Sequence, residues 1–134
     1  MLNALKITAM LLATALSAAT VTAGPSHSQQ LNRADLTGDK PMEVISSVSE
    51  YRPGDSLERH FHKGLEVAYV LQGATIQAPG KSPRQLAEGV SLLNLRDIPH
   101  GGFTIVGEQV LKLFTVHIVD KGQPVYHWLE SVTP

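Results

Sequence analysis

Glycine and proline divide the chain from residue 42 onward into short segments, with breaks at 52–54, 73, 78–83, 89, 101–102, 107 and 121–124. The runs between these breaks, such as 66–71 and 110–116, have the apolar and β-branched content that is typical of strands. No long stretch has the apolar period of a helix. Many short strands separated by regular turns predict an all-β sandwich or barrel.

Three candidate metal ligands stand close together within this pattern. His60 and His62 are two residues apart, which puts both imidazoles on one face of an extended strand. Glu66 follows a three-residue turn in which Gly64 permits unusual backbone angles, so the carboxylate can swing back toward the rings. Such a histidine pair can instead be exposed, with the glutamate as its solvated ion-pair partner. Two imidazoles and one carboxylate suit a divalent first-row transition metal.

Two glycines bracket these residues at a specific spacing. The order is glycine, five residues, histidine, one residue, histidine, three residues, glutamate, six residues and glycine, from Gly54 to Gly73. This segment resembles the first sequence motif of the cupin superfamily, with no position missing. The resemblance implies that His60, His62 and Glu66 are metal ligands.

A second segment resembles the second cupin motif in part. Gly89 and His100 match the first glycine and the histidine of that motif. Fifteen residues separate Gly89 from Gly73, where the first motif ends. Leu95 stands where proline is usual, Asp97 where glycine is usual, and Thr104 where asparagine is usual. The resemblance implies that His100 is the fourth ligand, and the short spacing between the motifs implies a compact single-domain (monocupin) member.

The cupin resemblance selects the double-stranded β-helix, or jelly-roll, barrel among all-β folds, and it covers about 45–119. It implies one divalent transition metal per chain, which can be Fe, Mn, Ni, Cu or Zn. Three imidazoles and one carboxylate leave two positions open on an octahedral ion, enough for a small organic substrate. We expect an oxygenase-like oxidoreductase in which Glu66 can also act as a base. A metal-assisted isomerase or lyase and a non-catalytic small-ligand-binding protein remain open alternatives.

The start of the chain resembles a secretory signal peptide. Lys6 precedes an uncharged, mostly apolar run from Ile7 to about Thr22, and Val21-Thr22-Ala23 fits a cleavage site. We therefore expect a signal peptide at 1–23, a polar linker or N-terminal arm at 24–41 and a cupin domain at 42–134. This division predicts a periplasmic or secreted protein with no membrane segment after cleavage.

Composition excludes several other functions. The chain has no cysteine, so disulfides, thiolate ligands and cysteine nucleophiles are excluded. After cleavage ten basic residues face twelve acidic ones with no basic tract, which argues against a nucleic-acid partner. The expected partners are a small-molecule substrate or ligand and, in a homodimer, a second copy of the chain.

Several other residues are candidates for minor roles. Phe61 should point away from the ligands, and three polar neighbours of the ligands are candidates for substrate contact, with ordinary surface ion pairs as the default: Arg59, Arg96 and Asp97. Three aromatic side chains can line either a pocket or the core: Tyr69, Phe103 and Phe114. Three histidines lie outside both motifs and receive no site assignment: His27, His117 and His127.

Overall fold

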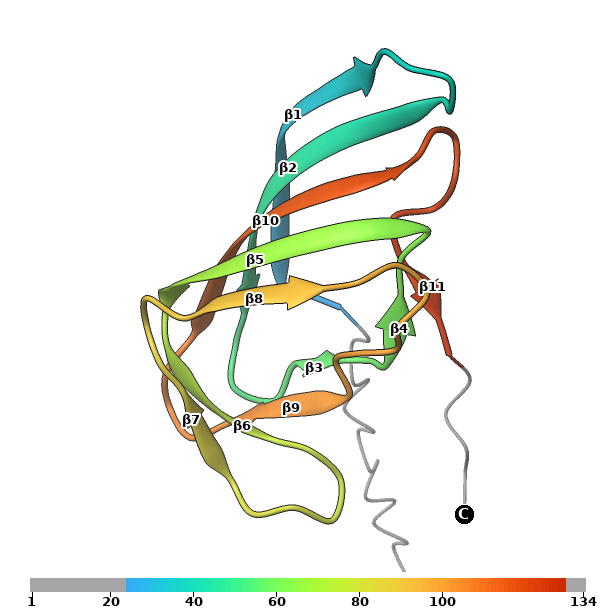
Figure 1. The fold of residues 1–134 in the computed structure, drawn as a ribbon. Helices are drawn as coiled ribbons and strands as arrows, with labels where there is room; N and C mark the ends of the chain where they lie inside the picture. Colours follow the sequence, from blue (N-terminus) through green and yellow to red (C-terminus); the bar gives the residue numbers. More distant parts are fainter. Residues whose placement is uncertain (1–23, 130–134) are drawn as a thin grey trace, which may run out of the picture.

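The computed structural model describes residues 24–129, which form eleven strands and no helix (Figure 1). The strands are β1 (His27–Leu36), β2 (Met42–Tyr51), β3 (Ser56–Leu57), β4 (His60–Phe61), β5 (Gly64–Gln72), β6 (Ala74–Gln77), β7 (Arg84–Leu86), β8 (Ser91–Asn94), β9 (Phe103–Val106), β10 (Leu111–Asp120) and β11 (His127–Trp128). The apolar run at 66–71 lies within β5, and most of 110–116 lies within β10. The all-β prediction is confirmed.

Two antiparallel sheets make up the barrel. One has the strand order β1-β2-β10-β5-β8 and the other β3-β9-β6-β7, while β4 and β11 form a separate two-stranded ribbon. Figure 1 shows the five-stranded sheet above the four-stranded one, with the ribbon at one end of both. Two facing sheets of this kind enclose a single interior.

The interior changes from apolar to polar along β10. Burial alternates strictly along this strand, which sends every second side chain inward. Leu111 and Leu113 join the apolar core cluster with Tyr51, Val70 and others. Further along the same face, His117 is 1% exposed and lies among buried polar groups. One half of the barrel is therefore a hydrophobic core, and the other half holds ionisable side chains.

The segment expected to be a linker or arm contains a strand. β1 pairs with β2 along its length, and all ten of its residues are exposed. Arg33 Nη1 donates to Glu43 Oε2 at 2.7 Å, which fixes β1 to the sheet through a buried carboxylate. A strand that is solvated on both faces has no apolar alternation, so its sequence gave no period to detect.

The expected signal peptide at 1–23 lies outside the described residues. Within 24–129, no helix is long and apolar enough to span a membrane.

Candidate metal centre

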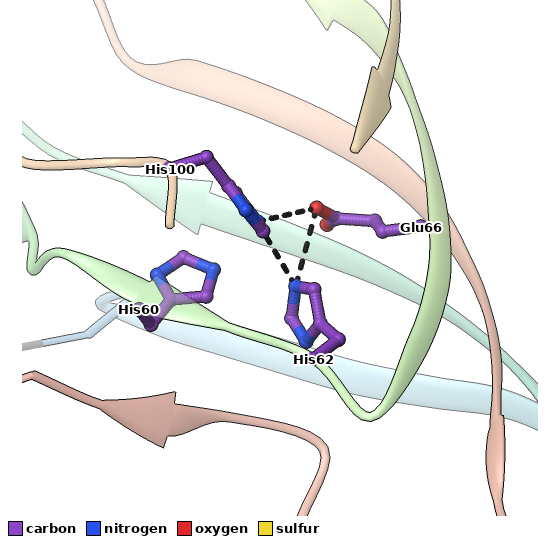
Figure 2. A group of neighbouring side chains, drawn as sticks. All are labelled: His60, His62, Glu66 and His100. Atoms are coloured by element: carbon purple, nitrogen blue, oxygen red, sulfur yellow. Dashed lines mark hydrogen bonds and ion pairs between the residues drawn. The ribbon is translucent and has the colours of Figure 1, made fainter. Parts of the chain in front are cut away.

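Four side chains from both cupin-like motifs meet inside the polar half of the barrel (Figure 2). His60 lies in β4, His62 directly follows it, Glu66 lies in β5, and His100 lies between β8 and β9. One ligand atom from each lies within 4.8 Å of the others. His60 and His100 also form a backbone bridge, with hydrogen bonds of 2.8 and 3.0 Å, which ties the two motifs together.

Backbone carbonyls orient all three imidazoles in the same way. The Nδ1 atom of His60 lies 2.7 Å from Glu58 O, that of His100 lies 3.0 Å from Ile98 O, and that of His62 contacts Val125 O. A carbonyl only accepts, so each Nδ1 must carry the proton. Each Nε2 is then free to bind a metal, which is the usual supporting arrangement around metal-ligating histidines.

The distances between the ligand atoms fit a cation at the centre of the cluster. His62 Nε2 lies 3.0 Å from His100 Nε2, and Glu66 Oε2 lies 3.3 and 3.1 Å from these two atoms. Two lone pairs and an anionic oxygen repel one another at this range unless a proton or metal ion lies between them. Bonds of about 2.1 Å at right angles to one ion would separate their donor atoms by about 3.0 Å. The residues therefore fit a divalent metal.

Glu66 is held as a buried anion. Burial raises the pKa of its carboxyl, but contacts with three imidazoles, that of His100 first, outweigh burial and hold the pKa well below its usual value. Burial also lowers the pKa of His60 to about 4, so this imidazole is neutral at pH 7. A neutral His60 beside an ionised Glu66 has the protonation states that metal binding requires.

His117 belongs to this cluster, although neither motif contains it. It lies opposite Glu66 in the β5–β10 pairing, and its Nε2 is 3.3 Å from Glu66 Oε1. The contact has the distance of an ion pair but not the angles of a hydrogen bond, since neither ring nitrogen has a hydrogen-bond partner among the described residues. His117 thus faces Oε1 while His62 and His100 face Oε2. The inward alternation of β10 is the sequence signal that indicates its direction.

Residues 125–128, which include β11, contact the histidines of the metal cluster. The sequence motifs did not predict these contacts. Trp128 pairs with His60 across β11 and β4, and Val125 supplies the carbonyl that orients His62. The ring of Tyr126 lies 5.0 Å from that of His60 and stacks on the indole of Trp128, also at 5.0 Å. Burial first, and then the charge of Glu66, raise the pKa of Tyr126 to about 12, so its phenol is neutral.

Two departures from expectation have clear backbone causes. Asp97, at the usual glycine position of the second motif, has φ 60 and is the one non-glycine residue with positive φ in the described part of the chain. Aspartate tolerates this left-handed conformation better than most residues, so the turn is preserved without glycine. Gly64 was expected to supply an unusual backbone angle, and this was wrong. It is not among the positive-φ glycines; instead, a Cβ there would lie 2.0 Å from Ile118 O.

The other candidate residues lie outside the cluster. Arg96 makes a bidentate ion pair with Asp120 at 2.8 and 2.9 Å. Asp97 Oδ1 lies 3.0 Å from Lys63 Nζ. The candidates Arg96 and Asp97 therefore both form surface ion pairs. Arg59 is exposed. Phe61 stacks on His127 at 5.0 Å, and Tyr69 is 45% exposed. Of the three ambiguous aromatics, Phe103 alone lines a cavity beside the cluster.

That cavity lies between the two sheets and has a volume of about 180 Å³. Glu66 and His100 form its polar end, together with Asn94. Six of its lining residues are apolar: Leu57, Ala68, Leu86, Leu92, Phe103 and Leu113. A small molecule in this cavity would lie directly against two of the four candidate ligands.

Asn94 orients the Glu66 carboxylate from the cavity side. Its Nδ2 donates to Glu66 Oε2 at 2.6 Å. We expect Asn94→Ala to weaken metal binding by about 10- to 100-fold, because outer partners of metal ligands contribute affinity of this size. Competition against a metal-binding dye measures the change. Asn32→Ala, on the exposed β1, is the matched control. Equal affinities in the two variants would contradict this role.

Comparisons with known proteins identify the fold. No protein-family model matches this chain, and no curated protein matches it. Among solved structures, it is similar to an uncharacterized conserved protein with a double-stranded β-helix domain from Klebsiella pneumoniae, with 16% identity, 80% of this chain and 90% of that chain covered, and a TM-score of 0.51.

Two proteins whose names state an activity have TM-scores with this chain that are close to that value. The polyketide cyclase RemF from Streptomyces resistomycificus has 20% identity, with 80% of this chain and 75% of that chain covered, and a TM-score of 0.50. A DMSP lyase has 17% identity, a TM-score of 0.51 and 65% of this chain covered, and this chain spans 44% of the lyase. The chain thus has the double-stranded β-helix fold that the cupin-like motifs predicted, with a cluster of His60, His62, Glu66 and His100 able to bind a metal ion.

Proposed function

We propose that this protein is a metal-dependent cupin enzyme that oxidises a small organic substrate in an oxygenase-like reaction. The convergence of three Nε2 atoms and one carboxylate, each held in a metal-binding orientation, is the observation that supports this proposal most directly. A bound iron, manganese, nickel or copper ion would supply redox chemistry and two open coordination positions. The cavity beside Glu66 and His100 provides the space for a substrate.

The cavity lining favours oxidation over proton transfer. Apart from Glu66 and His100, its one ionisable residue is Arg84. Glu66 is a weak base, because its neighbours hold its pKa far below neutral pH. An isomerase or lyase reaction needs an acid or base at the reacting atom, and this lining offers none beyond the ligands. The fold does not select the reaction, since the similar proteins include a cyclase and a lyase.

The same lining supports one alternative, a non-catalytic protein that binds a small ligand at the metal. The two functions predict different results in an oxygen-uptake assay. Protein reconstituted in turn with Fe, Mn, Ni, Cu and Zn is mixed with a panel of enolic substrates in an oxygen electrode. Substrate-dependent uptake with at least one redox metal, and none with zinc, is expected of the enzyme. No uptake with any metal would contradict the oxygenase-like reaction and leave ligand binding or a metal-assisted isomerase or lyase reaction.

The reaction is proposed to occur outside the cytoplasm. The signal-like segment at 1–23 supports this location. Mass spectrometry of the purified mature protein should find Gly24 at the amino terminus. A terminus at Met1 would contradict export by cleavage.

A further inference from the structure

An arginine, Arg84, belongs to the lining of the cavity beside the metal cluster. Arg84 lies in β7, two residues before Leu86, so the two side chains share one face of the strand. Leu86 is 5% exposed and belongs to the core cluster, which shows that this face points into the barrel. Arg84 itself is exposed and lines the same cavity as Glu66 and His100. The lining of the cavity therefore includes a solvent-exposed positive charge.

No described residue is placed to neutralise this charge. The side chain of Arg84 makes no hydrogen bond or ion pair with any residue in 24–129, whereas the side chains of Arg33 and Arg96 pair with Glu43 and Asp120. The one acidic residue in the cavity lining, Glu66, is already occupied by imidazoles and by Asn94. The guanidinium is thus free to receive an anion from solution, and its planar pair of N–H groups matches a carboxylate.

With a divalent metal ion bound, the net charge around the cavity also favours binding of an anion. Three neutral imidazoles, one carboxylate and a divalent ion carry a net charge of about +1, and Arg84 brings this to about +2. Water screens the charge of the exposed Arg84 more than it screens the charges of the buried cluster. An anionic molecule would be attracted at both ends of the cavity.

We propose that the substrate is a small carboxylic acid with an apolar body, whose carboxylate pairs with Arg84 while its other end faces the metal cluster. This rests on the proposed function, which places the reaction at that cluster. The body would contact Leu57, Leu92 and Phe103. The volume of about 180 Å³ lies below the roughly 300 Å³ at which pockets for drug-sized ligands begin, so the acid is small.

Binding to the zinc-loaded full chain tests this proposal without requiring any turnover. Isothermal titration calorimetry compares butyrate and benzoate with butyramide and benzamide, which have similar shapes but no charge. We expect each acid to bind at least about tenfold more tightly than its amide. Arg84→Gln should weaken acid binding by about tenfold and leave amide binding unchanged. Lys81→Gln, which removes an exposed charge from the turn before β7, should change neither.

Each other outcome overturns the proposal in a distinct way. If acids and amides bind equally, or methyl phosphate binds more tightly than either acid, the substrate class is wrong. If Arg84→Gln keeps the preference for acids, the carboxylate binds the metal instead. Leu92→Phe narrows the cavity without removing a charge, so unchanged acid binding in this variant would place the ligand elsewhere. Zinc content is measured on every sample, because a chain that binds no metal refutes the proposed function rather than this inference.

Discussion

Replacing His60 and His62 together by alanine is expected to reduce the metal content from about one ion per chain to near zero. The variant removes two of four donors and leaves Glu66 with His100, too few protein ligands to hold a transition ion through desalting. Inductively coupled plasma mass spectrometry of protein loaded with each metal and desalted measures the change. Iron, manganese, nickel or copper in the wild-type protein would favour oxidation, and zinc alone would favour an isomerase, lyase or binding role.

Two further variants separate ligand loss from misfolding. His27→Ala makes the same chemical change on the exposed β1 and should keep a full complement of metal. Glu66→Gln keeps the shape of the side chain but removes the anion that three imidazoles surround, so it should also lose most of the metal. Near-stoichiometric metal in the double histidine variant would refute the assigned centre.

Metal should also stabilise the wild-type fold. Without a cation, His62 Nε2, His100 Nε2 and Glu66 Oε2 hold lone pairs within 3.3 Å of one another. An ion that binds only the folded chain raises the free energy of unfolding, by about 2.7 kcal/mol at a hundred times its dissociation constant. Thermal melts should therefore shift upward with metal in the wild type and remain unchanged in the double histidine variant.

The ligands could be predicted from sequence because their spacing is local. His60, His62 and Glu66 lie within seven residues, and one strand and one turn bring them together. His100 required the second motif, and the structure brings it to the same point through its bridge with His60. The all-β class likewise followed from short apolar runs that correspond to real strands, such as β5.

The other contacts at the metal cluster and in the cavity depend on pairings between segments that are distant in the sequence. His117 faces Glu66 only because β10 pairs with β5 in one register, and a shift of one residue would turn it outward. Val125 and Tyr126 reach the centre through the β4–β11 ribbon, which joins segments more than sixty residues apart. Arg84 reaches the cavity because β7 closes the edge of the second sheet. No local pattern encodes these contacts.

Gly64 shows how a correct residue can be given the wrong physical role. It lies two residues before Glu66 and was expected to bend the chain. In the structure it lies in β5 opposite Val119 in β10, where its missing side chain allows close contact between the two backbones. The distances from an added Cβ would be 2.0 Å to Ile118 O and 2.6 Å to the Val119 Cα. Both atoms are backbone, so neither can rotate away.

Gly64→Ala is therefore expected to lower the free energy of unfolding by about 3 kcal/mol, near the upper end for overpacked sites, and the melting temperature by at least about 10 °C. Relief of the clash requires β5 to separate from β10, which would also move Glu66 away from His117. Any folded fraction should consequently bind metal more weakly than the wild type. Gly24→Ala, where an added Cβ meets nothing within 4 Å, is the control for thermal melts and metal titration. If both alanine variants melt at the wild-type temperature, Gly64 does not hold β5 and β10 in close contact, and the position of Glu66 must depend on other contacts.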